Sequence, residues 1–385
     1  MSEYKFDEKE EYESIRHNPY EFIQAFADMK LIIVGRQAFK RLALLPHTIF
    51  LPDISSNIIS NLSAVIIGDS GTGKSSLCKI FSPLCHEPLV RRTITEADLI
   101  ETANELRFLS IIIEDLTQSV TNEGYGLIKV LEGCIGEERA VMKSTLKTEY
   151  TEEVRAVGLF GITPQDLERY AKDLETGLLS RCILILISLK KEDYKKIAEF
   201  MTIKAGDLQY VEYLRKKQKI VEDFYEELRM IQRGRHKDYL IGKFGENHGK
   251  KIIEAVRGYH IEDNFKKQLL ARWNKISDNL LKQGHTPNNR ELSCYSKFLV
   301  SLAFLNIHNR KHDNGILTPT EEDHKLSLSL AIENMQWKWA IPLALKYNKK
   351  ATSREVLEKI LNDGLPEIVK EVLINISPYG KYLKD

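Results

Sequence analysis

Eight residues, Gly68 to Ser75, constrain the fold of this 385-residue chain more than any other feature. They match the pattern G-x-x-x-x-G-K-[ST] between an apolar run, Ala64–Ile67, and a helical run, Ser75–Phe81. Glycines in such a turn let successive backbone N–H groups point at phosphate oxygens, and the following helix N-terminus adds its dipole. The pattern therefore predicts a site for ATP and Mg²⁺ made of Gly68, Asp69, Ser70, Gly71, Thr72, Gly73, Lys74, Ser75 and Ser76.

Within this predicted site the individual roles follow from chemistry. Lys74 is expected to reach the β- and γ-phosphates, and the Ser75 hydroxyl is expected to bind Mg²⁺. The alternative is a glycine-rich turn that matches by chance. The strand before it and the helix after it favour the phosphate-binding interpretation.

A second apolar run, Ser110–Ile113, ends in two adjacent carboxylates, Glu114 and Asp115. ATPases use one acid to hold the metal and its water shell and another to orient the attacking water. From their order after the strand, we expect Glu114 to serve the metal and Asp115 the water, with exchanged roles as the alternative. Because this run follows the phosphate loop by about forty residues, we expect it to be the neighbouring strand of the sheet.

The wider pattern predicts an α/β fold. Strand-like runs alternate with helical segments from about Leu31 to Ser188, which indicates a mostly parallel sheet. The runs are Ala64–Ile67, Ser110–Ile113, Val157–Phe160 and Cys182–Ile187. After Lys190 only helices are expected, with breaks in the last part at Pro342, at Gly364-Leu365-Pro366 and at Pro378. The predicted organisation is an acidic lead-in (1–28), an α/β ATPase core (29–190), a helical lid (191–336) and a helical tail (337–385).

The net charge and the cysteines limit the classes of partner and the cellular compartment that fit this sequence. A net charge of +1 is unlike that of a protein that coats nucleic acid, so any DNA contact must come from local patches. No apolar run reaches the length of a membrane span, and the acidic start is unlike a signal peptide. The five cysteines have neither disulfide nor metal-ligand spacing: Cys78, Cys85, Cys134, Cys182 and Cys294. We expect a cytoplasmic protein without a membrane partner.

Three later segments complete a resemblance to the AAA+ ATPases, and most closely to the minichromosome maintenance (MCM) replicative helicases. Thr163 precedes Pro164 at the end of a strand, where the family has its sensor-1 asparagine. Leu178-Leu179-Ser180-Arg181 matches the family's arginine-finger motif. Asn289-Arg290-Glu291-Leu292 opens a helix like the lid helix that begins with the sensor-2 arginine, and the run from Leu317 to Asp323 opens the next.

The resemblance implies an AAA+ P-loop core with an α-helical lid, assembled as a homo-oligomeric ring, a hexamer being favoured. In such a ring Arg181 would reach the γ-phosphate of the nucleotide on the neighbouring subunit. The implied catalytic set is Lys74, Glu114, Asp115, Thr163, Arg181 and Arg290.

Several residues depart from the MCM pattern. Gly73 stands where MCM proteins usually have alanine, and the acid pair is reversed. The stretch between Lys74 and Glu114 is too short for the family's helix-2 insert, and the large N-terminal domain with zinc ligands is not expected. Misplacing a catalytic group by about 1 Å can cost a hundredfold in rate. These differences imply a reduced core in which hydrolysis is slow.

Residues 137–150 alternate in the manner of a β-hairpin and occupy the place of the MCM pre-sensor-1 hairpin. The resemblance implies that Lys143 or Lys147 contacts DNA phosphates there. The alternative is an exposed hairpin with solvated lysines, because five acids dilute the positive field: Glu137, Glu138, Glu149, Glu152 and Glu153.

We therefore expect an ATP-hydrolysing motor that acts as a DNA helicase or translocase in DNA replication. One alternative is a protein-remodelling or loader ATPase with replication proteins as partners. Another is a nucleotide-gated scaffold that hydrolyses ATP slowly. Stimulation of the ATPase by DNA would separate the first from the other two.

Overall fold

The computed structural model of the chain describes most of its length up to residue 347. The described ranges are 4–31, 35–68, 70–105, 108–116, 118–119, 125–137, 139–143, 149–163, 177–187, 191–203, 206–245, 252–282 and 290–347. Asp69, Lys147 and the helix breaks predicted after residue 347 lie outside these ranges.

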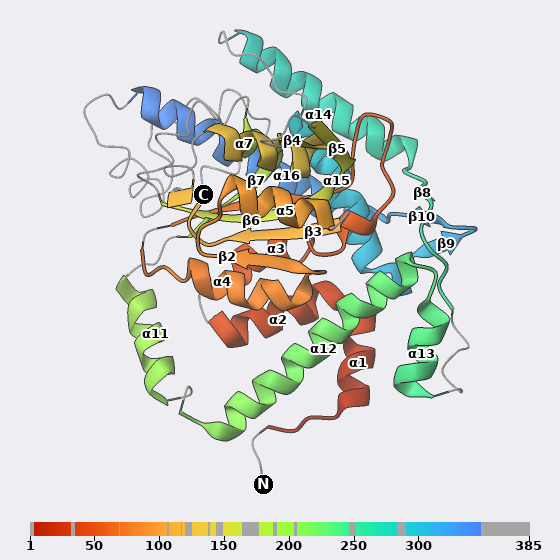
Figure 1. The fold of residues 1–385 in the computed structure, drawn as a ribbon. Helices are drawn as coiled ribbons and strands as arrows, with labels where there is room; N and C mark the ends of the chain where they lie inside the picture. The colour runs from red at the N-terminus through yellow and green to blue at the C-terminus, as the bar shows by residue number, and fades with distance from the viewer. Residues whose placement is uncertain are drawn as a thin grey trace.

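Five parallel strands form the central sheet, which confirms the predicted α/β class (Figure 1). Their order is β2-β3-β6-β1-β7. The bounds are β1 Ser63–Ile67, β2 Pro88–Arg91, β3 Phe108–Ile113, β6 Arg155–Ile162 and β7 Cys182–Leu186. Four of these strands coincide with predicted apolar runs, whereas β2 was not predicted.

One prediction about the sheet is wrong. The acid-bearing strand β3 does not neighbour the phosphate-loop strand β1, because β6 pairs with both and separates them. The central position of β6 suits its sequence, because seven of its eight residues are buried. Apolar strands of this kind occupy the middle of parallel sheets. As a consequence, the carboxyl end of β6 lies between the phosphate loop and the acid pair.

Successive residues of a strand face opposite sides of the sheet, so their side chains belong to two separate hydrophobic cores. Ala64 and Ile66 of β1 pack with helix α4 (Lys74–Phe81) and with the N-terminal helices α1 (Glu8–His17), α2 (Pro19–Leu31) and α3 (Gly35–Leu42). Val65 and Ile67 pack on the other side with α5 (Glu96–Glu105), α7 (Tyr125–Glu132) and α10 (Leu178–Arg181). Figure 1 shows α2 and α4 on one face of the sheet and α5 and α7 on the other.

The second half of the chain is mainly helical. Its helices are α11 (Lys191–Ile203), α12 (Leu208–Gln232), α13 (His236–Phe244), α14 (Asp263–Lys282), α15 (Arg290–Leu305) and α16 (Glu321–Tyr347). Short 3-10 turns occur in both halves of the chain. They are Thr48–Phe50 (η1) and Ser82–Leu84 (η2) in the first half and Ile307–Asn309 (η5) in the second. Helix α16 docks on the edge strand β7, where Asn334 Oδ1 accepts the Leu184 N–H at 2.9 Å. None of the helices in the described ranges is long and apolar enough to cross a membrane.

Two predictions for this half are wrong. Strands do not stop at Lys190, because β8 (Gly258–Tyr259), β10 (Ile316–Thr318) and β9 (Lys311–Asp313) form a small sheet. Its tight turn is Asn314-Gly315, whose φ values of 52° and 76° are those of a two-residue hairpin. Helix α16 also continues through Pro342, since a proline removes only one helical hydrogen bond and a long helix can pass it.

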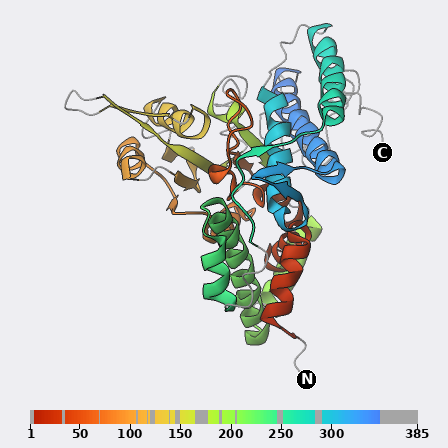
Figure 2. The ribbon, with the colours of Figure 1, turned by 90° about the vertical axis from the view of Figure 1, so that its right-hand side faces the viewer.

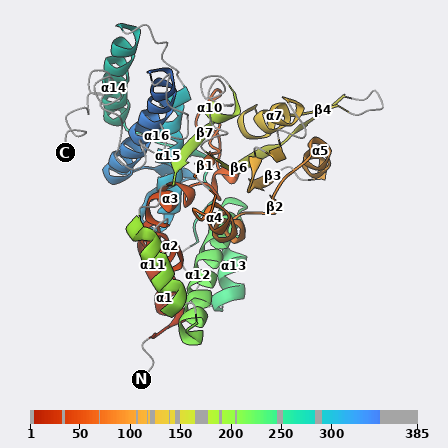
Figure 3. The same cartoon turned by 90° about the vertical axis from the view of Figure 1, so that its left-hand side faces the viewer.

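The predicted hairpin is present and projects from the body beside α5 and α7, as Figures 2 and 3 show. Strands β4 (Arg139–Lys143) and β5 (Glu149–Glu153) pair antiparallel. The π-helical turn η3 (Gly133–Glu137) leads into β4.

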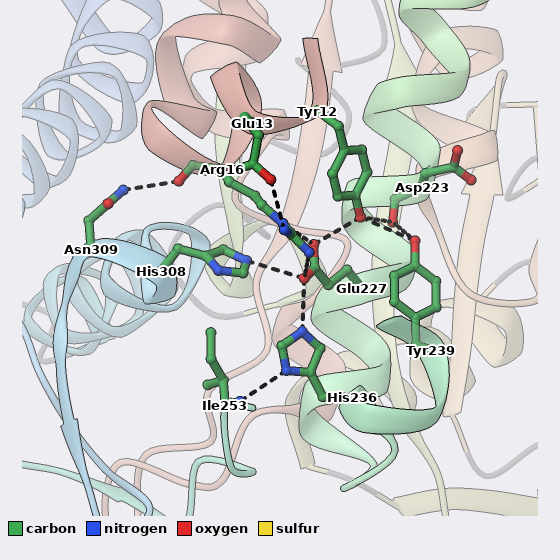
Figure 4. Close-up of polar contacts among 10 residues, drawn as sticks. All are labelled: Tyr12, Glu13, Arg16, Asp223, Glu227, His236, Tyr239, Ile253, His308 and Asn309. Carbon is green, nitrogen blue, oxygen red and sulfur yellow. Dashed lines mark hydrogen bonds and ion pairs between the residues drawn. The ribbon is translucent and has the colours of Figure 1, made fainter. Parts of the chain in front are cut away.

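A buried carboxylate joins α1 to the helical half (Figure 4). Glu227 on α12 is 0% exposed and accepts hydrogen bonds from Tyr12 Oη at 2.8 Å and from Arg16 Nε at 3.0 Å. His236 Nε2 lies 2.8 Å from the same carboxylate and His308 Nε2 lies 3.6 Å away. Burial alone would raise the pKa of Glu227, but these partners outweigh it and lower the pKa well below its usual range.

Candidate active site

Four strands end at one edge of the sheet, and the residues that follow them line a single cavity of about 370 Å³. Carboxyl ends of parallel strands are where ligands bind in open α/β sheets. The phosphate loop comes from β1, the acid pair from β3, and Thr163 from β6. The lining residues are Ser70, Gly71, Gly73, Lys74, Ser75, Ser76, Arg92, Glu114, Asp115, Gly161, Ile162 and Thr163.

The phosphate loop has the backbone shape that its glycines permit. Gly71 and Gly73 have φ values of 81° and 90°, in the left-handed region that side chains disfavour. Gly73 is the N-cap of α4, so the free N–H groups of that helix begin at the cavity. Lys74 Nζ donates to the Gly68 carbonyl at 2.5 Å, which holds the ammonium against the loop.

The acid pair is fixed by backbone contacts. The Glu114 N–H donates to Arg91 O at 3.0 Å and the Asp115 N–H donates to Arg92 O at 2.9 Å, extending the β2–β3 pairing into the loops. Asp115 Oδ1 accepts the Gln118 N–H at 3.1 Å. The carbonyl of Glu114 packs so closely on Gly161 that a Cβ at position 161 would come inside 3.0 Å, so only glycine fits there.

Arg92 is a cavity residue that sequence reasoning missed. It follows β2 directly, and its exposed side chain lines the cavity together with both acids. The sequence feature that could have indicated it is the pair of adjacent cations Arg91-Arg92, which follows the short apolar run Pro88–Val90. That run of three residues is too short to be recognised as a strand from its pattern alone.

The thiol of Cys78 lies on the helix that follows the phosphate loop, but it is not part of the cavity lining. Cys78 on α4 is buried. Burial first, and the charge of Glu114 second, raise the pKa of Cys78 to about 12. The thiol is therefore neutral and has the character of a core side chain.

Arg181 lies away from this cavity. It ends α10 and precedes β7, so it is at the amino edge of the parallel sheet, opposite the phosphate loop. Its guanidinium is 3.9 Å from Glu132 Oε1, and Nη1 donates to Gly177 O at 3.3 Å. The structure thus does not bring Arg181 together with Lys74 inside one chain.

Arg290 is the first residue of α15. Further along this helix, Ser293, Cys294 and Lys297 line a second cavity together with Arg181. The helix predicted to carry sensor 2 therefore runs beside Arg181 and not beside the phosphate loop.

Lys143 is the last residue of β4, where its backbone register partner is Glu149. Arg139 likewise pairs with Glu153. The hairpin therefore sets cations opposite acids across its two strands.

Compared with known proteins, the chain matches no protein-family model and no curated protein.

Proposed function

We propose that this chain is an ATPase of the AAA+ type, resembling the MCM helicases, that hydrolyses ATP with Mg²⁺ at sites shared between neighbouring copies in a ring. The observation that supports this most is the division of the predicted catalytic residues between two edges of one sheet. Lys74, Ser75, Glu114, Asp115 and Thr163 line the cavity at the carboxyl edge, whereas Arg181 lies at the amino edge. An arginine at this edge lies away from the cavity of its own chain, which supports a role at the nucleotide of another copy.

The residues of the cavity suit ATP and Mg²⁺. The left-handed glycines Gly71 and Gly73 shape a loop of inward N–H groups, which fits the phosphates, and Lys74 adds a cation beside them. Ser75 and one carboxylate are oxygen donors of the kind Mg²⁺ accepts alongside phosphate oxygens. The bound metal would neutralise charge that develops on the phosphates.

The two acids, Glu114 and Asp115, have different proposed roles. The Gln118 N–H donates to Asp115 Oδ1 and holds this oxygen in a fixed position, as a group that binds the metal's water shell requires. We therefore assign Asp115 to the metal's water shell and Glu114 to the attacking water, the exchanged version of the order that the sequence suggested. Thr163, which ends the strand between them and the loop, would hold the γ-phosphate or the water by its hydroxyl.

The direct test of the shared site uses two inactive variants. Lys74→Ala should abolish hydrolysis because it removes the phosphate-binding cation. Arg181→Ala should abolish it by about 10³-fold or more while ATP still binds. Mixing the two should restore part of the activity, because some interfaces then join an intact loop to an intact arginine. Mixed oligomers that show no recovery at any ratio would exclude a shared site.

DNA is the proposed substrate of the motor, in replication, with the β4–β5 hairpin as its contact. The hairpin projects from the body beside α5 and α7 (Figure 3). In the proposed ring it would contact DNA in the central channel. ATPase rates with and without single- and double-stranded DNA test this part separately. Stimulation by either form supports a helicase or translocase.

The pairing of Lys143 with Glu149 and of Arg139 with Glu153 favours a second candidate. A hairpin whose basic residues stand opposite acidic residues in the backbone register gives a weak net field, which suits a protein partner better than a phosphate backbone. An ATPase that DNA leaves unchanged, and that a replication or loader protein stimulates, would identify the chain as a remodelling ATPase.

A further inference from the structure

A carboxylate of the same chain, Glu132, contacts Arg181. Glu132 is the last residue of α7, and this helix packs against α10, which ends at Arg181. Glu132 Oε1 lies 3.9 Å from Arg181 Nη1. The side chains of Glu132 and Arg181 are only 8% and 13% exposed, so salt screens this ion pair less than it screens a pair at the surface.

The segment that follows Glu132 touches the arginine a second time. Gly136 lies in the π-helical turn η3, and a Cβ there would come inside 3.0 Å of Arg181 Cδ and Nε. Arg181 Nη1 also donates to Gly177 O at 3.3 Å. The carboxylate and the Gly177 carbonyl therefore face one nitrogen of the guanidinium, while η3 limits where its stem can lie. Together these contacts restrict the direction in which the guanidinium points.

Turn η3 is fixed to the central sheet. The buried side chain of Asn61 donates from Nδ2 to Ile135 O of η3 at 2.9 Å and to Ala156 O of β6 at 2.8 Å. One amide thus ties the turn to the strand that separates the phosphate loop from the acid pair. The contacts between this segment and Arg181 therefore have a rigid base.

Stability alone does not explain an acid at position 132. Burying a carboxylate is costly even when it is paired, and apolar residues in place of a buried ion pair are often equally or more stable. Another partner of Glu132 is Lys129, at 2.9 Å and one turn earlier on the same helix, but the Lys129 side chain is 54% exposed. A lysine with its head in water does not require a buried acid. The acid does, however, place a fixed negative charge beside the guanidinium of Arg181.

We propose that Glu132 is a positioning residue that orients Arg181 toward the nucleotide of the neighbouring copy. This inference rests on the proposed ATP site shared between copies. A guanidinium carries five N–H donors in a planar fork, so one edge can face a carboxylate while another edge binds phosphate oxygens. Because misplacing a catalytic group by about 1 Å can cost a hundredfold in rate, the orientation that Glu132 sets determines how effective the arginine is.

Glu132→Gln tests this role, because it keeps the size of the side chain and removes its charge. We expect kcat for ATP to fall by roughly a hundredfold. The Kd for ATP, measured with a fluorescent analogue, should stay unchanged, since the phosphate loop of the same chain is intact. Wild-type kcat in Glu132→Gln would overturn the proposal.

Asp223→Asn is the matched control for the loss of a largely buried carboxylate. The Asp223 side chain is 14% exposed, pairs with Lys219 on α12 and lines neither cavity. This variant should keep wild-type kcat. An equal fall of kcat in Asp223→Asn would mean that any lost ion pair slows the enzyme, and the assignment of Glu132 would be wrong.

Mixing variants separates a role at the shared site from general damage. Glu132→Gln chains have an intact phosphate loop, and Lys74→Ala chains have an intact Arg181 beside Glu132, so a mixture of the two should recover part of the activity. A mixture of Glu132→Gln with Arg181→Ala should recover nothing, because every arginine is then absent or misplaced. Recovery in this second mixture would contradict the proposal.

The inference and the proposed function fail in different ways. If Lys74→Ala recovers activity with Arg181→Ala but not with Glu132→Gln, the shared site is supported and the role of Glu132 is excluded. If Arg181→Ala keeps wild-type turnover, or does not restore Lys74→Ala in mixed oligomers, both are excluded.

A double variant gives a further test. Because Glu132 is proposed to act only through the arginine, Glu132→Gln combined with Arg181→Ala should keep the residual turnover of Arg181→Ala alone. An additional loss would show that Glu132 acts elsewhere and would reject the proposal. Should circular dichroism show that Glu132→Gln is unfolded, Glu132→Met, whose apolar side chain suits a buried position, is put through the same measurements.

Discussion

Gly136 and Arg181 touch so closely that no side chain fits between them. A Cβ at position 136 would come inside 3.0 Å of both Cδ and Nε of Arg181. Gly136 belongs to the π-helical turn η3, a kind of irregularity that often accompanies functional sites. The absence of a side chain at 136 therefore sets where the arginine lies.

Gly136→Ala should displace the arginine and leave the fold intact, because the long Arg181 side chain can move aside. A displacement near 1 Å at a catalytic group costs about a hundredfold. We expect kcat for ATP to fall by about that factor while the dissociation constant for ATP stays unchanged. Gly242→Ala, where a Cβ meets no atom within 4 Å, is the control. Wild-type turnover in Gly136→Ala would show that the position of Arg181 is unimportant.

Conservative amides separate the roles of the two acids. Glu114→Gln should bind ATP and Mg²⁺ normally but not turn ATP over, because the water loses its base. Asp115→Asn keeps an oxygen to accept the Gln118 N–H and should weaken the Mg²⁺ dependence of ATP binding instead. Titration of Mg²⁺ with a fluorescent ATP analogue measures this. The opposite pattern would restore the order expected from sequence.

Arg92→Ala should lower ATP turnover by about a hundredfold, the usual cost of losing one donor to a developing charge. Arg92 lines the cavity of its own chain, unlike Arg181. Mixing Arg92→Ala with Lys74→Ala should therefore restore nothing, since every site then carries one defect. Recovery of ATPase activity in that mixture would show that Arg92 acts on the nucleotide of the neighbouring chain.

Changing Lys143 and Lys147 together to alanine should weaken DNA binding and reduce its salt dependence. Each lost phosphate contact lowers the logarithmic slope by about 0.7–0.9. Basal ATPase should persist. The double change Lys311→Ala and Lys325→Ala, at exposed lysines elsewhere, is the control. An unchanged slope in the hairpin variant would place the DNA contact elsewhere.

Buried His47 should make stability depend on pH. Burial lowers the pKa of His47 from 6.5 to about 4, although the hydrogen bond to Ser301 opposes this. Between these values the unfolded chain binds the extra proton, so the free energy of unfolding should fall as pH drops from about 6.5 to 4. The loss is roughly 3 kcal/mol. Urea titrations at several pH values should show a flatter profile for His47→Gln than for the wild-type chain.

Local patterns predicted the parts of the fold that depend on short stretches of sequence. The phosphate loop and the strands around Val65, Ile112, Phe160 and Leu184 follow from apolar runs and glycine spacing. The position of β6 between β1 and β3 depends on pairing between distant segments, which no local pattern contains. The second cavity was missed for the same reason, because residues 58, 181, 297 and 338 meet only in the folded chain. Arg92 was missed because the strand before it, β2, is too short to be recognised from its pattern.

The Glu227 cluster also implies an order of folding. Arg16 and its carboxylate partner are 211 residues apart, and Tyr12 and the same carboxylate are 215 apart. Because the ribosome releases α1 and α2 long before α12, the buried face of α1 can contact α2 early but lacks its α12 partner during most of synthesis. Contacts of such long range form slowly, since the closure of a long loop precedes them. Helix α1 is made well before α12 but completes its packing only after it, so a nascent chain that stops before Leu208 would leave Tyr12 without its Glu227 partner.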